Sequence, residues 1–86
     1  MDRDAFIKTL DDGKTFANGV HNPVKLERFD GRYTLSGNGF LTAADSYEFV
    51  KDDPNMIIFT KSITIENKTV GILKFIITCS DWKVSE

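Results

Sequence analysis

The side chains best suited to nucleophilic or acid–base chemistry are one histidine and one cysteine among 86 residues. His21 precedes Asn22-Pro23, a dipeptide typical of an exposed turn, so we expect a solvated loop histidine. Cys79 ends an apolar run, where burial raises the pKa of a thiol and makes it a poor nucleophile. One histidine excludes any metal site that needs two, and one cysteine excludes an internal disulfide or a cysteine-based zinc site. The sequence therefore predicts no catalytic residue, no metal site and no cofactor.

Two pairs of adjacent carboxylates, at residues 11–12 and 52–53, have the charge to hold a hard cation such as magnesium or calcium. Neither pair has the spacing of an EF-hand, so we expect both to be solvated turn residues. Residues 36–40 carry two glycines, but the lysine of a Walker loop and the third glycine of a dinucleotide fingerprint are missing. This segment is predicted to be a turn.

Basic and aromatic side chains surround a predicted turn at Asp30-Gly31, on a hairpin that could contact an acidic protein surface or nucleic-acid phosphates. Glu27 and Asp30 lower the local charge to +1, so charge pairing within the hairpin explains the pattern equally well. Trp82 is a further candidate because tryptophan is enriched in binding hot spots, with a lid over a small core as the alternative. The predicted partner-binding residues are Lys25, Arg28, Phe29, Asp30, Arg32, Tyr33 and Trp82.

Composition limits the class of protein further. The chain is 41% hydrophobic with a net charge of −2, which is too apolar and too weakly charged for intrinsic disorder. Nucleic-acid-binding domains usually carry a basic stripe or a high pI, whereas the pI here is about 5.3. A mass of 9.7 kDa fits a single domain over residues 1–86, which would expose roughly 5,100 Å² when folded.

The N-terminus, Met1-Asp2-Arg3-Asp4, lacks the basic start and apolar run of a secretory signal. The longest apolar stretch, residues 70–79, is interrupted by Lys74 and is too short to span a bilayer. A free cysteine in an apolar strand suits a reducing compartment. We therefore expect a cytoplasmic protein without membrane contact.

Two helices are predicted. The first covers residues 3–12, where Asp2 or Asp4 can cap the N-terminus. Its apolar side would be formed by Ala5, Phe6, Ile7 and Leu10, and Phe16 and Val20 would extend that surface into the following loop.

The second helix begins at Thr42, because Thr42 followed by Asp45 resembles a capping box. Ala43, Tyr47 and Val50 would share one of its faces. A strand over residues 47–50 is the alternative, since aromatic side chains alternate there.

The clearest hairpin spans residues 24–36, because Asp-Gly supplies the positive φ values of a type I′ turn. Closing that turn would pair Phe29 with Arg32, Arg28 with Tyr33, Glu27 with Thr34 and Leu26 with Leu35.

A second hairpin is predicted over residues 56–79, which hold seven of the eight isoleucines. A two-residue turn at 67–68 would pair Ile63 with Ile72 and mix apolar residues onto both faces. We expect instead a three-residue loop at 67–69, which pairs Ile63 with Leu73 and separates the faces. The same register pairs Ile57 with Cys79 and Phe59 with Ile77, and sets Lys61 opposite Phe75 as a bulge or an edge residue. This hairpin would form the centre of the core.

The predicted fold is α+β, in the order α-β-β-α-β-β, with a mostly antiparallel four-stranded sheet and two helices on one face. Elimination favours a small intracellular protein that binds another protein, as an inhibitor, immunity partner or accessory factor of the kind encoded by phages and mobile elements. The alternative is a nucleic-acid-binding module that uses the hairpin of Lys25, Arg28 and Arg32, which the net charge disfavours. A small-ligand binder or enzyme is the least favoured class. Self-association through the exposed edge of the long hairpin fits all three.

Overall fold

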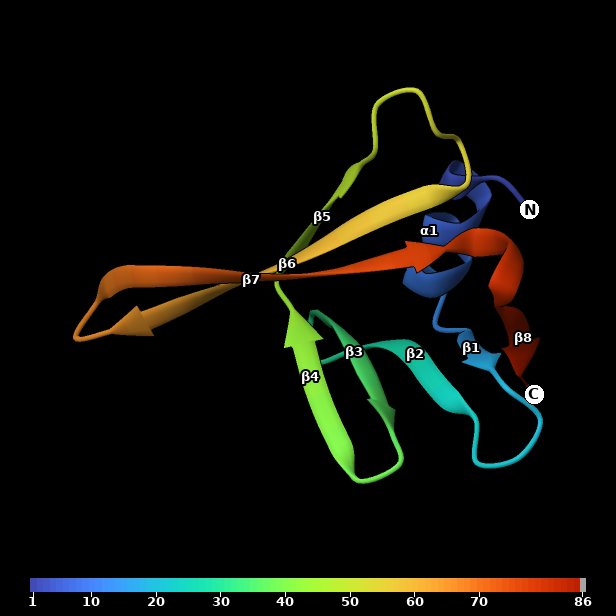
Figure 1. Cartoon of the computed structure of the whole chain (residues 1–86), viewed down its shortest axis with the longest axis horizontal. Helices are drawn as coiled ribbons and strands as arrows, with labels where there is room; N and C mark the ends of the chain where they lie inside the picture. Colours follow the sequence, from blue (N-terminus) through green and yellow to red (C-terminus); the bar gives the residue numbers. More distant parts are fainter. Residues whose placement is uncertain (86) are drawn as a thin grey trace.

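The computed structural model describes Met1–Ser85, which form one α-helix, a short 3-10 helix and eight strands in two antiparallel sheets (Figure 1). The helices are α1 (Arg3–Asp11) and η1 (Cys79–Asp81). One sheet has the strand order β4-β3-β2-β1-β8, formed by β4 (Phe40–Ala44), β3 (Arg32–Gly37), β2 (Val24–Phe29), β1 (Thr15–Asn18) and β8 (Lys83–Ser85). The other has the order β5-β6-β7, formed by β5 (Ser46–Phe49), β6 (Met56–Ile65) and β7 (Lys68–Thr78). The α+β class is confirmed, but the predicted α-β-β-α-β-β order, four-stranded sheet and two helices are wrong.

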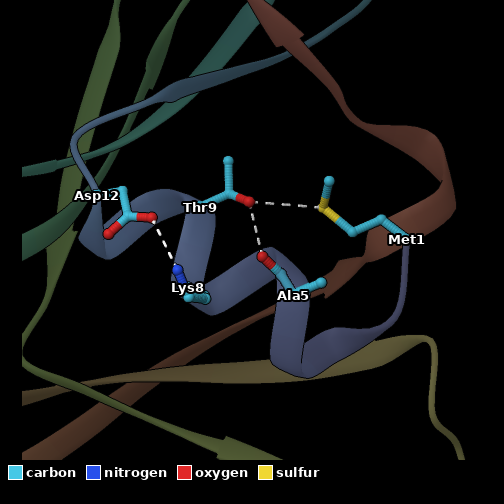
Figure 2. A network of polar contacts seen from close by, with 5 residues as sticks. All are labelled: Met1, Ala5, Lys8, Thr9 and Asp12. Carbon is cyan, nitrogen blue, oxygen red and sulfur yellow. Dashed lines mark hydrogen bonds and ion pairs between the residues drawn. The ribbon is translucent and has the colours of Figure 1, made fainter.

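Helix α1 forms where it was predicted. The Asp2 carboxylate accepts a hydrogen bond from the backbone N–H of Ala5 at 2.8 Å, and so caps the helix. Figure 2 shows polar contacts along the helix, where the Thr9 hydroxyl donates to the Ala5 carbonyl at 2.7 Å and Lys8 pairs with Asp12 at 3.4 Å. These contacts leave the opposite, apolar side of α1 for the core.

Strand β1 was missed by the sequence interpretation, which placed a loop after the helix. The Phe6 ring of α1 stacks on the Phe16 ring of β1 with centroids 4.0 Å apart, and both side chains are buried. Val20 does not extend this surface, because it is 89% exposed in the turn that follows. The short tail after Cys79 pairs at the sheet edge, with Val84 opposite Phe16, while Trp82 packs against the core.

The predicted second helix over residues 42–50 is wrong, and its strand alternative is the better description. A tight turn at Asn38-Gly39, both with positive φ, folds β4 back onto β3. The chain then leaves the first sheet at Asp45, whose backbone N–H donates to the Thr60 carbonyl at 2.9 Å, and continues as β5 against β6. Backbone pairing on both sides of Asp45 outweighs the local capping signal of Thr42.

Hairpin β2–β3 is confirmed with its register. Asp30 and Gly31 have φ of 53° and 77°, as a type I′ turn requires. All four predicted pairs are observed, including Leu26 opposite Leu35 and Arg28 opposite Tyr33.

Hairpin β6–β7 is also observed, but both registers considered from the sequence are wrong. The turn residues are Glu66 and Asn67, with φ of 52° and 65°, and a register shift between Ile63 and Thr64 accommodates them. Ile57 pairs with Ile77 and Phe59 with Phe75, whereas Lys61 lies opposite Leu73 rather than Phe75. The register preferred from the sequence differs from the observed register by two residues. Because side chains alternate between faces with a period of two, those near the root of the hairpin still lie on their predicted faces.

The buried core comprises Phe6, Ile7, Leu10, Phe16, Leu26, Tyr33, Ala44, Ile57, Phe59, Ile77 and Cys79. Only the root of the isoleucine-rich hairpin belongs to it, so the expectation that the whole hairpin forms the core centre is wrong. β5 begins at Ser46, which pairs with Thr60, and beyond this pair the hairpin projects from the body as a two-stranded arm, residues 61–73 (Figure 1). The molecule exposes 5920 Å², about 800 Å² more than the roughly 5,100 Å² of a compact monomer of this mass.

Candidate functional site

The most distinctive surface is a row of exposed apolar side chains on β7, which we call the apolar strip: Val70, Ile72, Leu73 and Ile76. Their exposed fractions lie between 54% and 59%, and Ile65 at the tip of the arm is 60% exposed. Several large apolar side chains exposed close together on one strand mark contact sites more often than single exposed residues do.

The strip lies on both faces of β7. Leu73 points to the face that Phe59 and Phe75 share with the core, since alternate residues of a strand point the same way. Ile72 and Ile76 point to the opposite face, on either side of Lys74. A strand with apolar residues on both faces is typical of a sheet interior.

Strand β7 nevertheless lies at an edge. It follows β6 in the order β5-β6-β7, and no strand of residues 1–85 pairs with its outer side. The N–H and C=O groups on that side can therefore pair with another chain. Only Lys68 and Lys74 carry charge along its eleven residues.

Lys74 forms an ion pair with Glu48 of β5 at 3.6 Å, reaching across Thr60 of β6. Both side chains are more than half exposed, so the pair contributes little to stability. A shallow hollow of about 290 Å³ lies beside it, lined by Ser46, Tyr47, Glu48, Thr60, Ile72 and Lys74. The ion pair thus places a charged group within the apolar strip, between Ile72 and Ile76.

The predicted partner-binding residues do not form one surface. Strand alternation places Arg28 and Tyr33 on the face toward α1, and Lys25, Phe29 and Arg32 on the other face. Trp82 lies beyond β1, on the side of the sheet away from hairpin β2–β3.

The inward-facing pair is part of a polar cluster with Asp11 at the end of α1. The Tyr33 hydroxyl donates to the Asp11 carboxylate at 2.9 Å, and Arg28 pairs with the same oxygen at 3.1 Å. The Arg28 guanidinium also lies over the Tyr33 ring, 4.9 Å from its centroid. Burial, followed by the hydrogen bond to Asp11, raises the pKa of Tyr33 to about 12. The cluster joins α1 to the sheet, and Tyr33 is only 4% exposed.

The outward-facing residues are more accessible. Phe29 is 67% exposed. Lys25, near the start of β2, and Asp30, in the turn that follows β2, are also exposed. Arg32 forms an ion pair with Asp45 at 3.4 Å. Two of the three basic residues proposed for contact with a partner are thus already paired with carboxylates.

The residues considered for catalysis lie apart. His21 is exposed in the turn between β1 and β2. Cys79 is 2% exposed, and burial raises the pKa of its thiol. Asp53 accepts a hydrogen bond from the backbone of Asn55 at 3.0 Å, a turn role.

Metal-ligating side chains do not gather anywhere within residues 1–85, which contain no group of three or more histidine, cysteine or acidic side chains arranged to hold a metal ion. No helix in this part of the chain has the length and apolar character needed to cross a membrane.

A comparison with known proteins found no matching family model, curated protein or solved structure.

The apolar strip was missed by the sequence interpretation, although a signal for it was present. Residues 70–77 are apolar at odd and even positions alike, with Lys74 and Gly71 as the exceptions. Assigning the odd positions to the core leaves Ile72 and Ile76 without a role. Apolar residues on both faces of a predicted edge strand would have indicated a contact surface.

Proposed function

We propose that this chain acts by binding a protein inside the cell and that the apolar strip is its contact surface. The observation that carries the proposal is the character of β7: an edge strand with apolar residues on both faces, of which the four strip residues remain more than half exposed. Contact with a partner would remove this apolar surface from water, which is the main driving force of protein association. An inhibitor, immunity partner or accessory factor would act in this way, by covering a surface of its target.

The remaining features support binding of protein over binding of nucleic acid or catalysis. Arg28 and Arg32 are engaged with Asp11 and Asp45, which weakens their attraction for phosphates. The net charge of −2 acts in the same direction. The thiol of Cys79 is buried and His21 lies in an exposed turn, so neither is activated by a neighbouring group in the manner of a nucleophile–base pair.

The test is photo-cross-linking in the source cells. A photoreactive phenylalanine analogue at Ile72 should yield a covalent adduct with a protein, identified by mass spectrometry after purification of the chain. The matched control carries the same analogue at Val20, which is equally apolar and 89% exposed but lies in the turn after β1. An adduct from position 72 and none from position 20 is the expected result. Equal labelling at both positions, or no protein adduct from position 72, would refute the proposal.

A further inference from the structure

We infer that the protein seated on the apolar strip is a second copy of this chain, joined by antiparallel pairing of β7 with β7 of that copy. This inference rests on the proposed function and specifies its partner. The two three-stranded sheets would become one sheet in the order β5-β6-β7-β7-β6-β5. The open edge of β7 would be paired in each copy, leaving the two β5 strands as the outer edges.

The exposed surface area of the molecule supports an interface large enough for a stable dimer. The chain exposes about 800 Å² more than a compact monomer of its mass. Each partner in a stable protein–protein interface of standard size buries about 800 Å². The Cα radius of gyration is likewise large, 13.2 Å against about 12 Å for a compact domain of this length. The projecting arm contributes to both excesses, because it extends away from the body as a two-stranded hairpin (Figure 1).

The symmetry of antiparallel pairing determines the possible registers. A two-fold axis normal to the sheet keeps each face of one copy continuous with the same face of the other. Two paired residues must therefore lie on the same face of β7, so that both have odd numbers or both have even numbers. Centring the axis on Lys74 would place two lysines directly opposite, which is destabilising. Centring it on Leu73, the middle of β7, gives regular pairing over residues 71–75 of both copies, which ends at the irregularity around Val70. In that register Leu73 lies opposite Leu73, and Ile72 lies opposite Lys74 of the second copy.

The same symmetry explains why the arm extends beyond its own core. Because the two β7 strands run in opposite directions, the tip of one arm lies beside the root of the other. The two bodies lie on the same face of the joined sheet. Leu73 and Ile65 of the arm, which point toward the body side but extend past their own body, would then approach the body of the second copy.

The first experiment locates the axis by disulfide formation. In Leu73→Cys the two thiols would lie on directly opposed residues, whose Cβ atoms are about 4.5–5.5 Å apart, so mild oxidation should link the copies. The control is Ile76→Cys, which is similarly exposed but six residues from its counterpart, or about 20 Å along the strands. The native Cys79 is buried and serves as the background in the unmodified chain.

The second experiment tests the register through charge. Ile72→Glu and Ile72→Lys both remove the same apolar side chain, but in a dimer the new side chain faces Lys74 of the other copy. The introduced glutamate would gain two opposite-charge pairs per dimer, and the introduced lysine would create two like-charge pairs. The dissociation constants should therefore differ by about tenfold or more, with Ile72→Glu the tighter. The difference should shrink at high salt. Sedimentation equilibrium of the purified chain measures both constants.

The outcomes separate this inference from the proposed function. A concentration-dependent mass reaching twice 9.7 kDa, with cross-linking at position 73 and not at 76, supports it. A chain that stays monomeric while the probe at Ile72 captures a different protein overturns it and leaves the proposed function standing. A dimer that does not cross-link at position 73 and does not distinguish the two charged substitutions of Ile72 uses another surface, which also overturns it. A monomer whose Ile72 probe captures nothing refutes both.

Discussion

At the scale of single residues, Asp11 connects α1 to the sheet through two side chains that are distant in sequence. Its carboxylate accepts the Tyr33 hydroxyl and pairs with Arg28, which are 22 and 17 residues away along the chain. The sequence predicted that Arg28 and Tyr33 would face each other, because an Asp-Gly turn determines cross-strand pairs. It could not predict Asp11 as their partner, because the position of α1 over the sheet depends on packing between elements.

The first prediction concerns the hydrogen bond between Tyr33 and Asp11. Replacing Tyr33 with Phe should lower the free energy of unfolding at neutral pH by about 1 kcal/mol, because one buried hydrogen bond is lost without a cavity. The difference should depend on pH. The folded pKa of Tyr33 is about 12, above the ordinary value of 10.0, so the folded state favours the neutral phenol. The wild-type advantage is therefore complete below pH 10 and is lost as the pH rises to 12.

Denaturant titrations of both proteins from about pH 8 to about pH 12 measure this difference. The other ionisable groups are common to both chains and cancel in the comparison. A difference between the two proteins that stays constant across that range would contradict the assignment.

At the scale of elements, the second hairpin shows where local patterns are insufficient. The isoleucine-rich strands predicted a hairpin correctly, and its faces near the root were also right. The register was wrong because the turn uses Glu66 with a positive φ, a conformation that glutamate rarely adopts. The second helix failed for a related reason, since Thr42 and Asp45 satisfy a local helix-capping pattern while their backbone groups pair with strands from elsewhere in the chain.

The strained turn gives the second prediction. The double substitution Glu66→Asn and Asn67→Gly supplies the residues preferred in a type I′ turn and should stabilise the chain by about 1 kcal/mol. Chemical denaturation at low protein concentration checks this value without a contribution from association. The matched control is Gly31→Ala in the β2–β3 turn, where φ is 77°, which should destabilise the chain by a similar amount. Destabilisation by the Asn-Gly pair would show that the left-handed conformation of Glu66 is not a source of strain.

At the scale of the whole molecule, the surplus of exposed surface could not be foreseen from composition. Mass alone predicts the area of a compact shape, whereas the length of the β6–β7 arm depends on where β5 stops pairing. The core residues contributed by α1 and hairpin β2–β3 were largely recognisable from their spacing. The division of β7 into a buried root and an exposed arm was not recognisable, because residues 70–77 are apolar almost throughout.

The third prediction follows from that surplus. If two copies pair through β7, the melting temperature of the wild type should rise with protein concentration, because association stabilises only the folded chain. Ile72→Lys should melt at a temperature that does not change with concentration. Differential scanning calorimetry over a wide range of concentration makes the comparison. If the melting temperature of the wild type stays the same over the whole range of concentration, pairing through β7 is contradicted.

The pairing of β1 with β8 has a consequence for how the chain folds during its synthesis. Phe16 lies opposite Val84, so the five-stranded sheet joins β1 to β8, the first and last strands of residues 1–85. During synthesis β8 leaves the ribosome after β1 to β7, and the outer side of β1 stays open in between. Hairpins β2–β3 and β6–β7 need only nearby residues and can form as soon as they emerge. The sheet that joins β1 to β8 is therefore completed only after β7, the strand with the apolar strip, has left the ribosome.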